Sequence, residues 1–144
     1  RDKLGLLGTD ERDKNLILDL LTWMHQNKVD YTNTFCNLMN FKTHKNTIYE
    51  DKNFSNWKKR WQERLSTHNN SHEKYTNLMR RKNPLVIPRN HKVEDILREA
   101  TQGNLKPFNK FFEILINPYT DNENILEYQV PSKSNKIYQT FCGT

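Results

Sequence analysis

The architecture of this chain follows from the stretch NHKVEDILREATQGNLKPFNKFFEIL, residues 90–115. Its apolar residues recur every three or four positions in two runs, which predicts two helices that each bury one face. The residues expected to face inward are Val93, Ile96, Leu97 and Ala100, then Phe108, Phe111, Phe112 and Leu115. Gly103 should end the first helix in a left-handed conformation, and Pro107 is tolerated in the first turn of the second. These features predict an αα-hairpin.

Four further helices are predicted before the hairpin by the same spacing. Their expected inward-facing residues are Leu16, Ile17, Leu20, Leu21, Trp23 and Met24; Tyr31, Phe35, Leu38 and Met39; Phe54, Trp57, Trp61 and Leu65; and Tyr75, Leu78 and Met79. The predicted N-terminal caps are Thr9, Asp30, Asn53, Asn90 and Asn104. The expected polar face of the third helix carries Lys58, Lys59, Glu63 and Arg64. The fourth helix must end before Pro84, because a residue that precedes proline is pushed out of the helical region.

These elements predict an all-α fold, an irregular small helical domain of about five or six helices with an extended C-terminal tail. We expect the helical domain to cover residues 1–118. In residues 119–144 the periodicity vanishes, so an irregular tail is expected there, with Tyr128, Tyr138 and Phe141 as its candidate anchors. The chain has only four glycines, which also favours helices over a multi-stranded fold.

The composition limits the class of protein. With seven Phe, six Tyr and three Trp among 144 residues, the chain can form one aromatic-rich core, unlike a disordered segment. It has no leader and no apolar run of transmembrane length, so a soluble chain without a membrane partner is expected. Two widely spaced cysteines indicate a reducing, cytoplasmic location. Because the chain starts at Arg1, we expect it to be a fragment of a longer protein.

The net charge of +6 and the pI near 9.3 allow a nucleic-acid or acidic-surface partner. Basic residues are spread over the chain and form no dominant stripe, so a solvated Lys-rich surface is the favoured interpretation. The run at residues 80–82, Arg-Arg-Lys, can meet phosphates, but cations are also favoured at a helix C-terminus.

No complete active site is visible in the sequence. Neither of the glycine-rich phosphate-binding loops occurs, and the kinase catalytic-loop and metal-binding motifs are also missing. His68 and His72 have the spacing of a zinc-binding pair, yet an exposed loop is favoured because the accompanying glutamate pattern is missing. Trp57 and Trp61 are assigned to the core in preference to a base-stacking platform. We therefore predict no catalytic, cofactor-binding or metal-binding residue in this chain.

Three residues, Arg89, Asn90 and Cys142, remain as candidates for other roles. Arg89 and Asn90 follow the extended apolar segment at residues 85–88, and a rigidly presented arginine can dock a neighbouring domain. A structural salt bridge is the alternative for Arg89. Cys36 is expected to be buried and inert, whereas Cys142 lies close to the C-terminus as an incidental surface thiol or a redox-active one.

Residues 83–119, NPLVIPRNHKVEDILREATQGNLKPFNKFFEILINPY, resemble the C-terminal region of the selenoprotein O family. The run N-P-x-x-I-P-R-N-H-x-V-E within them is long and specific. KLGL at residues 3–6, DYTNTF at 30–35 and YQTFCGT at 138–144 are similar to the same family, in the same order and spacing. The resemblance therefore covers nearly the whole chain.

The resemblance implies a pseudokinase-like protein adenylyltransferase. Such a protein binds ATP and Mg²⁺ or Mn²⁺ in a kinase-like cleft, with the nucleotide reversed, and transfers AMP to Ser, Thr or Tyr hydroxyls of protein substrates. The residues that bind nucleotide and metal lie before this segment, so the resemblance carries none of them onto the chain. It implies a redox role for Cys142, although the final Gly-Thr departs from the Ser-Ser of many members.

We therefore expect the C-terminal helical segment of an ATP-dependent protein adenylyltransferase, inactive alone, whose partners are the missing N-terminal kinase-like domain and the parent's protein substrates. The alternative is an independent helical binding module for nucleic acid or protein. A nucleic-acid binder would show a steep salt dependence and a specificity ratio, whereas the adenylyltransferase segment would bind nucleic acid weakly and without sequence preference.

Overall fold

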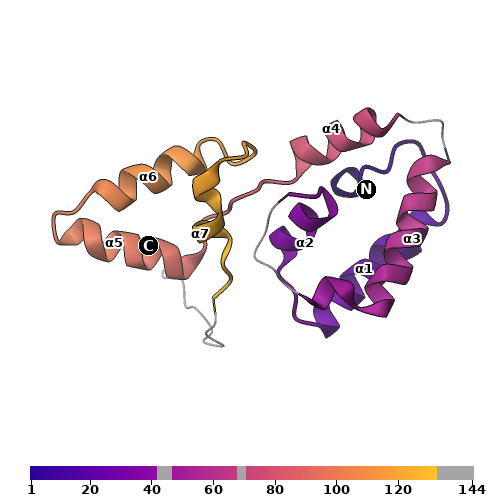
Figure 1. The fold of residues 1–144 in the computed structure, drawn as a ribbon, viewed down its shortest axis with the longest axis horizontal. Coiled ribbons are helices and arrows are strands. Elements are labelled where there is room, and N and C mark those ends of the chain that lie inside the picture. Colours follow the sequence, from indigo (N-terminus) through magenta and orange to yellow (C-terminus); the bar gives the residue numbers. More distant parts are fainter. Residues whose placement is uncertain (42–46, 68–70, 133–144) are drawn as a thin grey trace, which may run out of the picture.

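The computed structural model describes residues 1–41, 47–67 and 71–132. These residues form helices and no strand, which confirms the all-α fold class. The α-helices are α1 (Asp13–Gln26), α2 (Tyr31–Leu38), α3 (Lys52–Ser66), α4 (His72–Lys82), α5 (Asn90–Thr101), α6 (Lys106–Leu115) and α7 (Leu126–Gln129). The 3₁₀ segments are η1 (Asp2–Leu4), η2 (Thr47–Glu50) and η3 (Glu123–Ile125). Figure 1 shows α1–α4 as one group and α5–α7 as another, joined by the extended chain after α4.

The first group of helices packs around an aromatic core. Phe54, Trp57 and Trp61 lie on one face of α3 and are buried. The rings of Trp57 and Trp61 are nearly parallel, with an interplanar angle of 8°. Their indole N–H groups donate to the backbone carbonyls of Leu16 and Leu4, at 2.8 and 2.9 Å. The assignment of both tryptophans to the core is therefore confirmed.

Arg64 differs from the prediction, which placed it on the polar face of α3. Its side chain is only 4% exposed. The guanidinium Nε donates to the buried carboxylate of Asp13 at 2.6 Å, and Nη2 donates to the carbonyl of Leu7 at 3.0 Å. Arg1 donates to the same carboxylate at 2.9 Å. Burial of Arg64 is tolerated because its charge is paired and hydrogen-bonded, which the spacing of residues along one helix does not reveal.

Of the three capping residues predicted for α1, α2 and α3, one is correct and two are wrong. Asp30 caps α2 as expected, since its side chain accepts a hydrogen bond from the backbone of Asn33. Asn53 does not cap α3; the residue two positions earlier, Asp51, accepts from the first-turn amides. Thr9 caps nothing, because α1 begins only at Asp13 and has no side-chain cap.

The inward faces of α1 and α2 are narrower than predicted. Leu20 and Trp23 are buried, but Leu21 is 40% exposed and Tyr31 is 47% exposed. α1 packs mainly against α3, so one stripe of its surface is covered and the neighbouring stripe remains in solvent. Leu21 and Tyr31 are therefore not core residues of the described chain.

α5 and α6 form the predicted αα-hairpin (Figure 1), and Gly103 between them adopts a left-handed φ of +90°. A Cβ atom at Gly103 would meet nothing within 4 Å, so backbone conformation alone favours glycine there. Neither Asn90 nor Asn104 is at the cap position, which Arg89 and Leu105 occupy. Asn90 already lies in the first turn of α5, and Asn104 stands one residue before the cap of α6, where its side chain accepts from the backbone N–H of Lys106 at 3.4 Å.

The packed face of the hairpin also differs from the prediction. Its buried apolar residues are Ile96, Phe111 and Ile114. Three residues predicted to face inward are exposed by 49%, 40% and 53%, namely Leu97, Phe108 and Phe112. Apolar residues occur on two sides of α6, and the described chain covers only the side that carries Phe111.

Part of the predicted irregular tail is helical, since η3 and α7 lie within residues 119–132. Tyr128 in α7 is buried, and its ring stacks on Phe111 with centroids 4.8 Å apart. Tyr128 thus acts as the expected anchor. Tyr138 and Phe141 lie outside the described residues, and the domain boundary after residue 118 stays a prediction.

Candidate functional site: a buried polar junction

A set of polar side chains lies where the two groups of helices meet. Asp30 precedes α2, and its Oδ1 accepts from the backbone N–H of Asn33 at 2.9 Å. Arg89, directly before α5, donates to both oxygens of the same carboxylate, at 2.6 and 2.9 Å. We call Asp30, Asn33, Arg89 and Gln129 the polar junction. Arg89 therefore forms the structural salt bridge that was the alternative to a docking role.

The environment of Asp30 favours its charged form. Partial burial by itself would raise the pKa of the Asp30 carboxyl, because a charged group is poorly solvated there. The hydrogen bonds from Arg89 and from the backbone of Asn33 outweigh this effect and hold the pKa below its ordinary value. Asp30 is thus a paired carboxylate, and its environment does not favour the protonated form that a general acid requires.

The junction extends to α7 through two amide side chains. The Nδ2 of Asn33 donates to the backbone carbonyl of Gln129 at 2.9 Å, and the Nε2 of Gln129 donates to that of Leu85 at 2.8 Å. Gln129 is 1% exposed, so these bonds lie inside the molecule. Within the part of the chain that the structure describes, two junction atoms have no hydrogen-bond partner, the Nε of Arg89 and the Oε1 of Gln129. The junction connects α2, the segment before α5 and α7 in one network.

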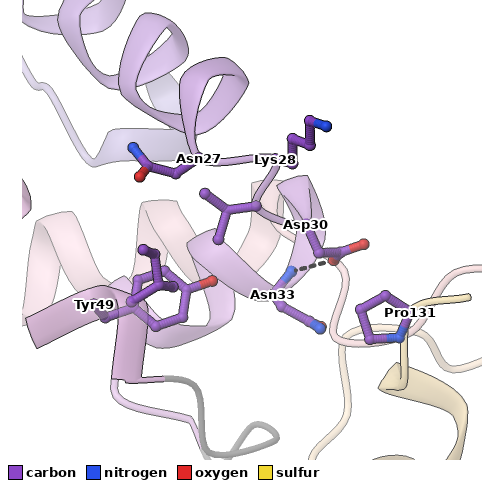
Figure 2. A pocket seen from close by; sticks show the side chains of 8 residues that line it. Asn27, Lys28, Asp30, Asn33, Tyr49 and Pro131 are labelled. Carbon is purple, nitrogen blue, oxygen red and sulfur yellow. Dashed lines mark hydrogen bonds between the residues drawn. The ribbon is translucent and has the colours of Figure 1, made fainter. Parts of the chain in front are cut away.

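A pocket of about 460 Å³ lies beside the junction, and Figure 2 shows the side chains that line it. Asp30, Asn33 and Pro131 belong to its lining, and Figure 2 shows Pro131 on the same side as Asp30, away from Tyr49. The Tyr49 hydroxyl, also in the lining, lies 3.1 Å from the hydroxyl of Thr34. Asp30, Asn33 and Tyr49 already have hydrogen-bond partners within the chain. The described residues of the lining place no nucleophile beside a base.

Cys36 lies close to the junction and is fully buried. Burial, followed by the nearby negative charge of Asp30, raises the pKa of its thiol to about 11. A thiol needs to be deprotonated to act as a nucleophile or a metal ligand. The prediction of a buried Cys36 is confirmed, and the raised pKa agrees with an inert role.

The remaining sequence candidates are the histidine pair, the basic run at residues 80–82 and Cys142. His72 is exposed at the start of α4, and its potential partner His68 lies outside the described residues. The basic run at residues 80–82 ends α4, where cations complement the helix dipole. Cys142 also lies outside the described residues. Among the candidates that the structure describes, Arg89 belongs to the junction and Cys36 lies beside it, whereas His72 and the basic run lie on α4.

Two negative findings concern the described part of the chain. Residues 1–41, 47–67 and 71–132 contain no group of three or more His, Cys, Asp or Glu side chains that could hold a metal ion. Each helix in the same ranges is too short or too polar to span a bilayer.

Sequence reasoning identified Asp30 only as a cap and did not identify Asn33 or Gln129 at all. Asn33 stands 96 residues from Gln129, a separation at which helical spacing carries no information. One signal was available, because Gln129 follows Tyr128, which was already named as an anchor.

Comparison with known proteins defines the class. The sequence model of the family described as protein adenylyltransferase SelO matches residues 1–116 of this chain. Because this match covers well over half of the 144 residues, the chain belongs to that family. The resemblance noted in the sequence is thereby confirmed.

The similar curated proteins carry the name protein nucleotidyltransferase YdiU. The relative from Pelagibacter ubique is 53% identical over 146 residues, which cover 100% of this chain and 30% of the relative. Those from Alcanivorax borkumensis and Bacillus thuringiensis are 40% and 41% identical, and the match again covers 30% of each relative. The chain thus spans less than a third of the length of these relatives.

Proposed function

We propose that this chain is the helical C-terminal part of an ATP-dependent protein adenylyltransferase. In this proposal a kinase-like domain outside the chain transfers AMP to Ser, Thr or Tyr hydroxyls of protein substrates. The observation that carries it is the family match over residues 1–116, together with relatives named as protein nucleotidyltransferases. The 30% coverage of those relatives leaves room for a separate catalytic domain.

ATP and Mg²⁺ or Mn²⁺ belong, in this proposal, to the kinase-like part. This placement is supported by two observations on the described residues: they bring no group of three or more His, Cys, Asp or Glu side chains together, and the junction carboxylate of Asp30 is paired with Arg89. We therefore assign no step of AMP transfer to a residue of this chain. Its contribution is to present a rigid helical unit to the catalytic domain.

The loop at residues 88–90 is our proposed contact with that domain. Pro88 and Asn90 are exposed, whereas Arg89 is turned toward Asp30 and only 10% exposed. Replacement of Arg89 would disturb the chain itself, so Asn90→Ala is the informative variant. It should lower the thermal stability of the full-length parent, meaning the complete gene product that contains this chain. An unchanged parent would argue against the contact.

Cys142 is proposed as a redox thiol of the parent, on the resemblance alone. Its thiol and a cysteine of the kinase-like part would join as a disulfide, and a dithiol–disulfide exchange partner would accept the two electrons and two protons. The rate of AMP transfer by the parent should then change when dithiothreitol is added, and the rate of the Cys142→Ser variant should stay the same. Equal responses of the two proteins would exclude this role.

The central experiment compares the parent with the 144-residue chain, each incubated with radiolabelled ATP, Mg²⁺ and a protein acceptor. Labelled acceptor is expected with the parent and background labelling with the chain. Labelling by the chain alone would place a catalytic site within these residues and contradict the proposal. A parent without any transfer activity, tested with both Mg²⁺ and Mn²⁺, would contradict it as well.

A further inference from the structure

Several large apolar side chains on α6 and its flanks are exposed. We call Leu105, Phe108, Phe112, Ile116 and Tyr119 the α6 stripe. Their exposed fractions are 55%, 40%, 53%, 58% and 51%. Phe108 and Phe112 lie on one face of α6, Leu105 and Ile116 adjoin its two ends at the same spacing of three or four residues, and Tyr119 follows in the turn beyond the helix.

The opposite side of α6 is already packed. Phe111 and Ile114 are buried there, and Phe111 stacks on Tyr128. A helix that is apolar on both sides is normally buried on both sides, because a helix at a water interface keeps a polar face. The charged residues of α6 do not cover the stripe, since its members keep 40% or more of their surface exposed.

The stripe is also ordered. The rings of Phe108 and Phe112 lie nearly parallel, with an interplanar angle of 8° and centroids 6.2 Å apart. Two aligned aromatic rings, followed by Ile116 one turn later, form the row of anchors with which a helix fills an apolar groove. Aromatic residues are enriched in the cores of protein interfaces.

We infer that the α6 stripe docks into an apolar groove of the kinase-like domain of the same polypeptide, an inference that rests on the proposed function. The match to the relatives covers only 30% of their length, so most of a family member lies outside this chain. That missing polypeptide is covalently attached, and a tethered partner reaches its site at a high effective concentration. An apolar face needs no charge on its partner, which distinguishes this surface from the basic run at the end of α4.

The test uses cysteine labelling with iodoacetamide, followed by peptide mass spectrometry that locates each modified residue. Ile116→Cys is made in the parent and in the 144-residue chain. In the chain it should react quickly. In the parent its rate of labelling should be lower by a factor of roughly ten, since the packed core of an interface excludes solvent. Leu18→Cys is the matched control, because Leu18 is 49% exposed on α1 outside the stripe, and it should react alike in both proteins.

Equal labelling of Ile116→Cys in the two proteins would overturn the inference. Protection that appears in the isolated chain with rising protein concentration would point to a second copy as the occupant, and protection only after RNA is added would point to nucleic acid. Either result contradicts the inference. AMP transfer by the parent is measured separately. A parent in which Ile116→Cys is protected but AMP transfer is absent would contradict only the proposed function. A parent that transfers AMP but leaves Ile116→Cys unprotected would contradict only the docking.

Discussion

The carboxylate of Asp30 makes several contacts at once. It closes the N-terminus of α2, pairs with Arg89 from a position 59 residues later, and borders the pocket in Figure 2. Helix capping is worth about 1 kcal/mol, and a bidentate charged pair adds to it where water is partly excluded. Stability at this site therefore depends on one residue whose contacts belong to two parts of the sequence.

Removal of Arg89 should be costly because it leaves a partly buried carboxylate without its charge partner. We expect Arg89→Ala to lower the free energy of unfolding by about 2–3 kcal/mol, less than for a fully buried pair, since Asp30 is 19% exposed. Urea denaturation of the 144-residue chain measures this value. The control is Arg98→Ala, which breaks an exposed pair with Asp95 and should have little effect. Equal losses in both variants would contradict a special role for the junction.

The lowered pKa of Asp30 predicts an acid-dependent loss of stability. The folded chain keeps this carboxylate charged at pH values where the unfolded chain takes up a proton. The stabilisation is complete above the ordinary value of about 4 and is lost as the pH falls through the lower folded value. Asp30→Asn retains a capping side chain but cannot titrate, so the slope of stability against pH below about 5 should become shallower. Urea titrations at several pH values test this, and an unchanged slope would refute it.

At the scale of the elements, two turns of this chain require glycine for different structural reasons. Gly5 and Gly103 both have positive φ, +68° and +90°. A Cβ at Gly5 would lie 3.1 Å from the backbone oxygen of Tyr75 and from Cγ of Met79, whereas one at Gly103 would meet open space. The first position is therefore limited by conformation and by packing, and the second by conformation only.

The two alanine variants should separate these effects. Gly103→Ala is expected to cost about 1–2 kcal/mol, the penalty for a left-handed L-residue. Gly5→Ala should cost more, about 2–4 kcal/mol, because η1 must also move away from α4. Urea midpoints of both variants, measured in the same chain, provide the comparison. A Gly103→Ala loss that equals or exceeds the Gly5→Ala loss would contradict the packing argument.

For the whole molecule, the helices form two packed groups, and α7 supports the second one (Figure 1). Tyr128→Ala removes the ring that covers Phe111 and should lower stability by about 3 kcal/mol. Hydrogen exchange should become faster in α5 and α6 while α1 and α3 keep their protection, because those helices retain their own aromatic core. Uniform acceleration over all helices would show one cooperative unit instead.

The elements of the fold were largely predictable, and the site was not. Trp57 and Trp61 were assigned to the core, and Gly103 to the hairpin turn, because helical spacing and a left-handed glycine are local signals. Arg64 was placed in solvent because local spacing treats every arginine as a polar surface residue. Its partner Asp13 is 51 residues away, and only packing brings the two together.

The difference between what sequence and structure reveal has a physical reason. The helical period of 3.6 residues depends only on neighbouring positions, so the sequence alone established the all-α class, the order of the main helices and the family. Long-range pairing depends on how distant helices pack, and therefore only the folded chain revealed that Arg89 meets Asp30 and that Gln129 joins them. The same reason holds for α6, since its apolar residues occur on two sides and packing alone selected Phe111 for the interior and left Phe112 exposed.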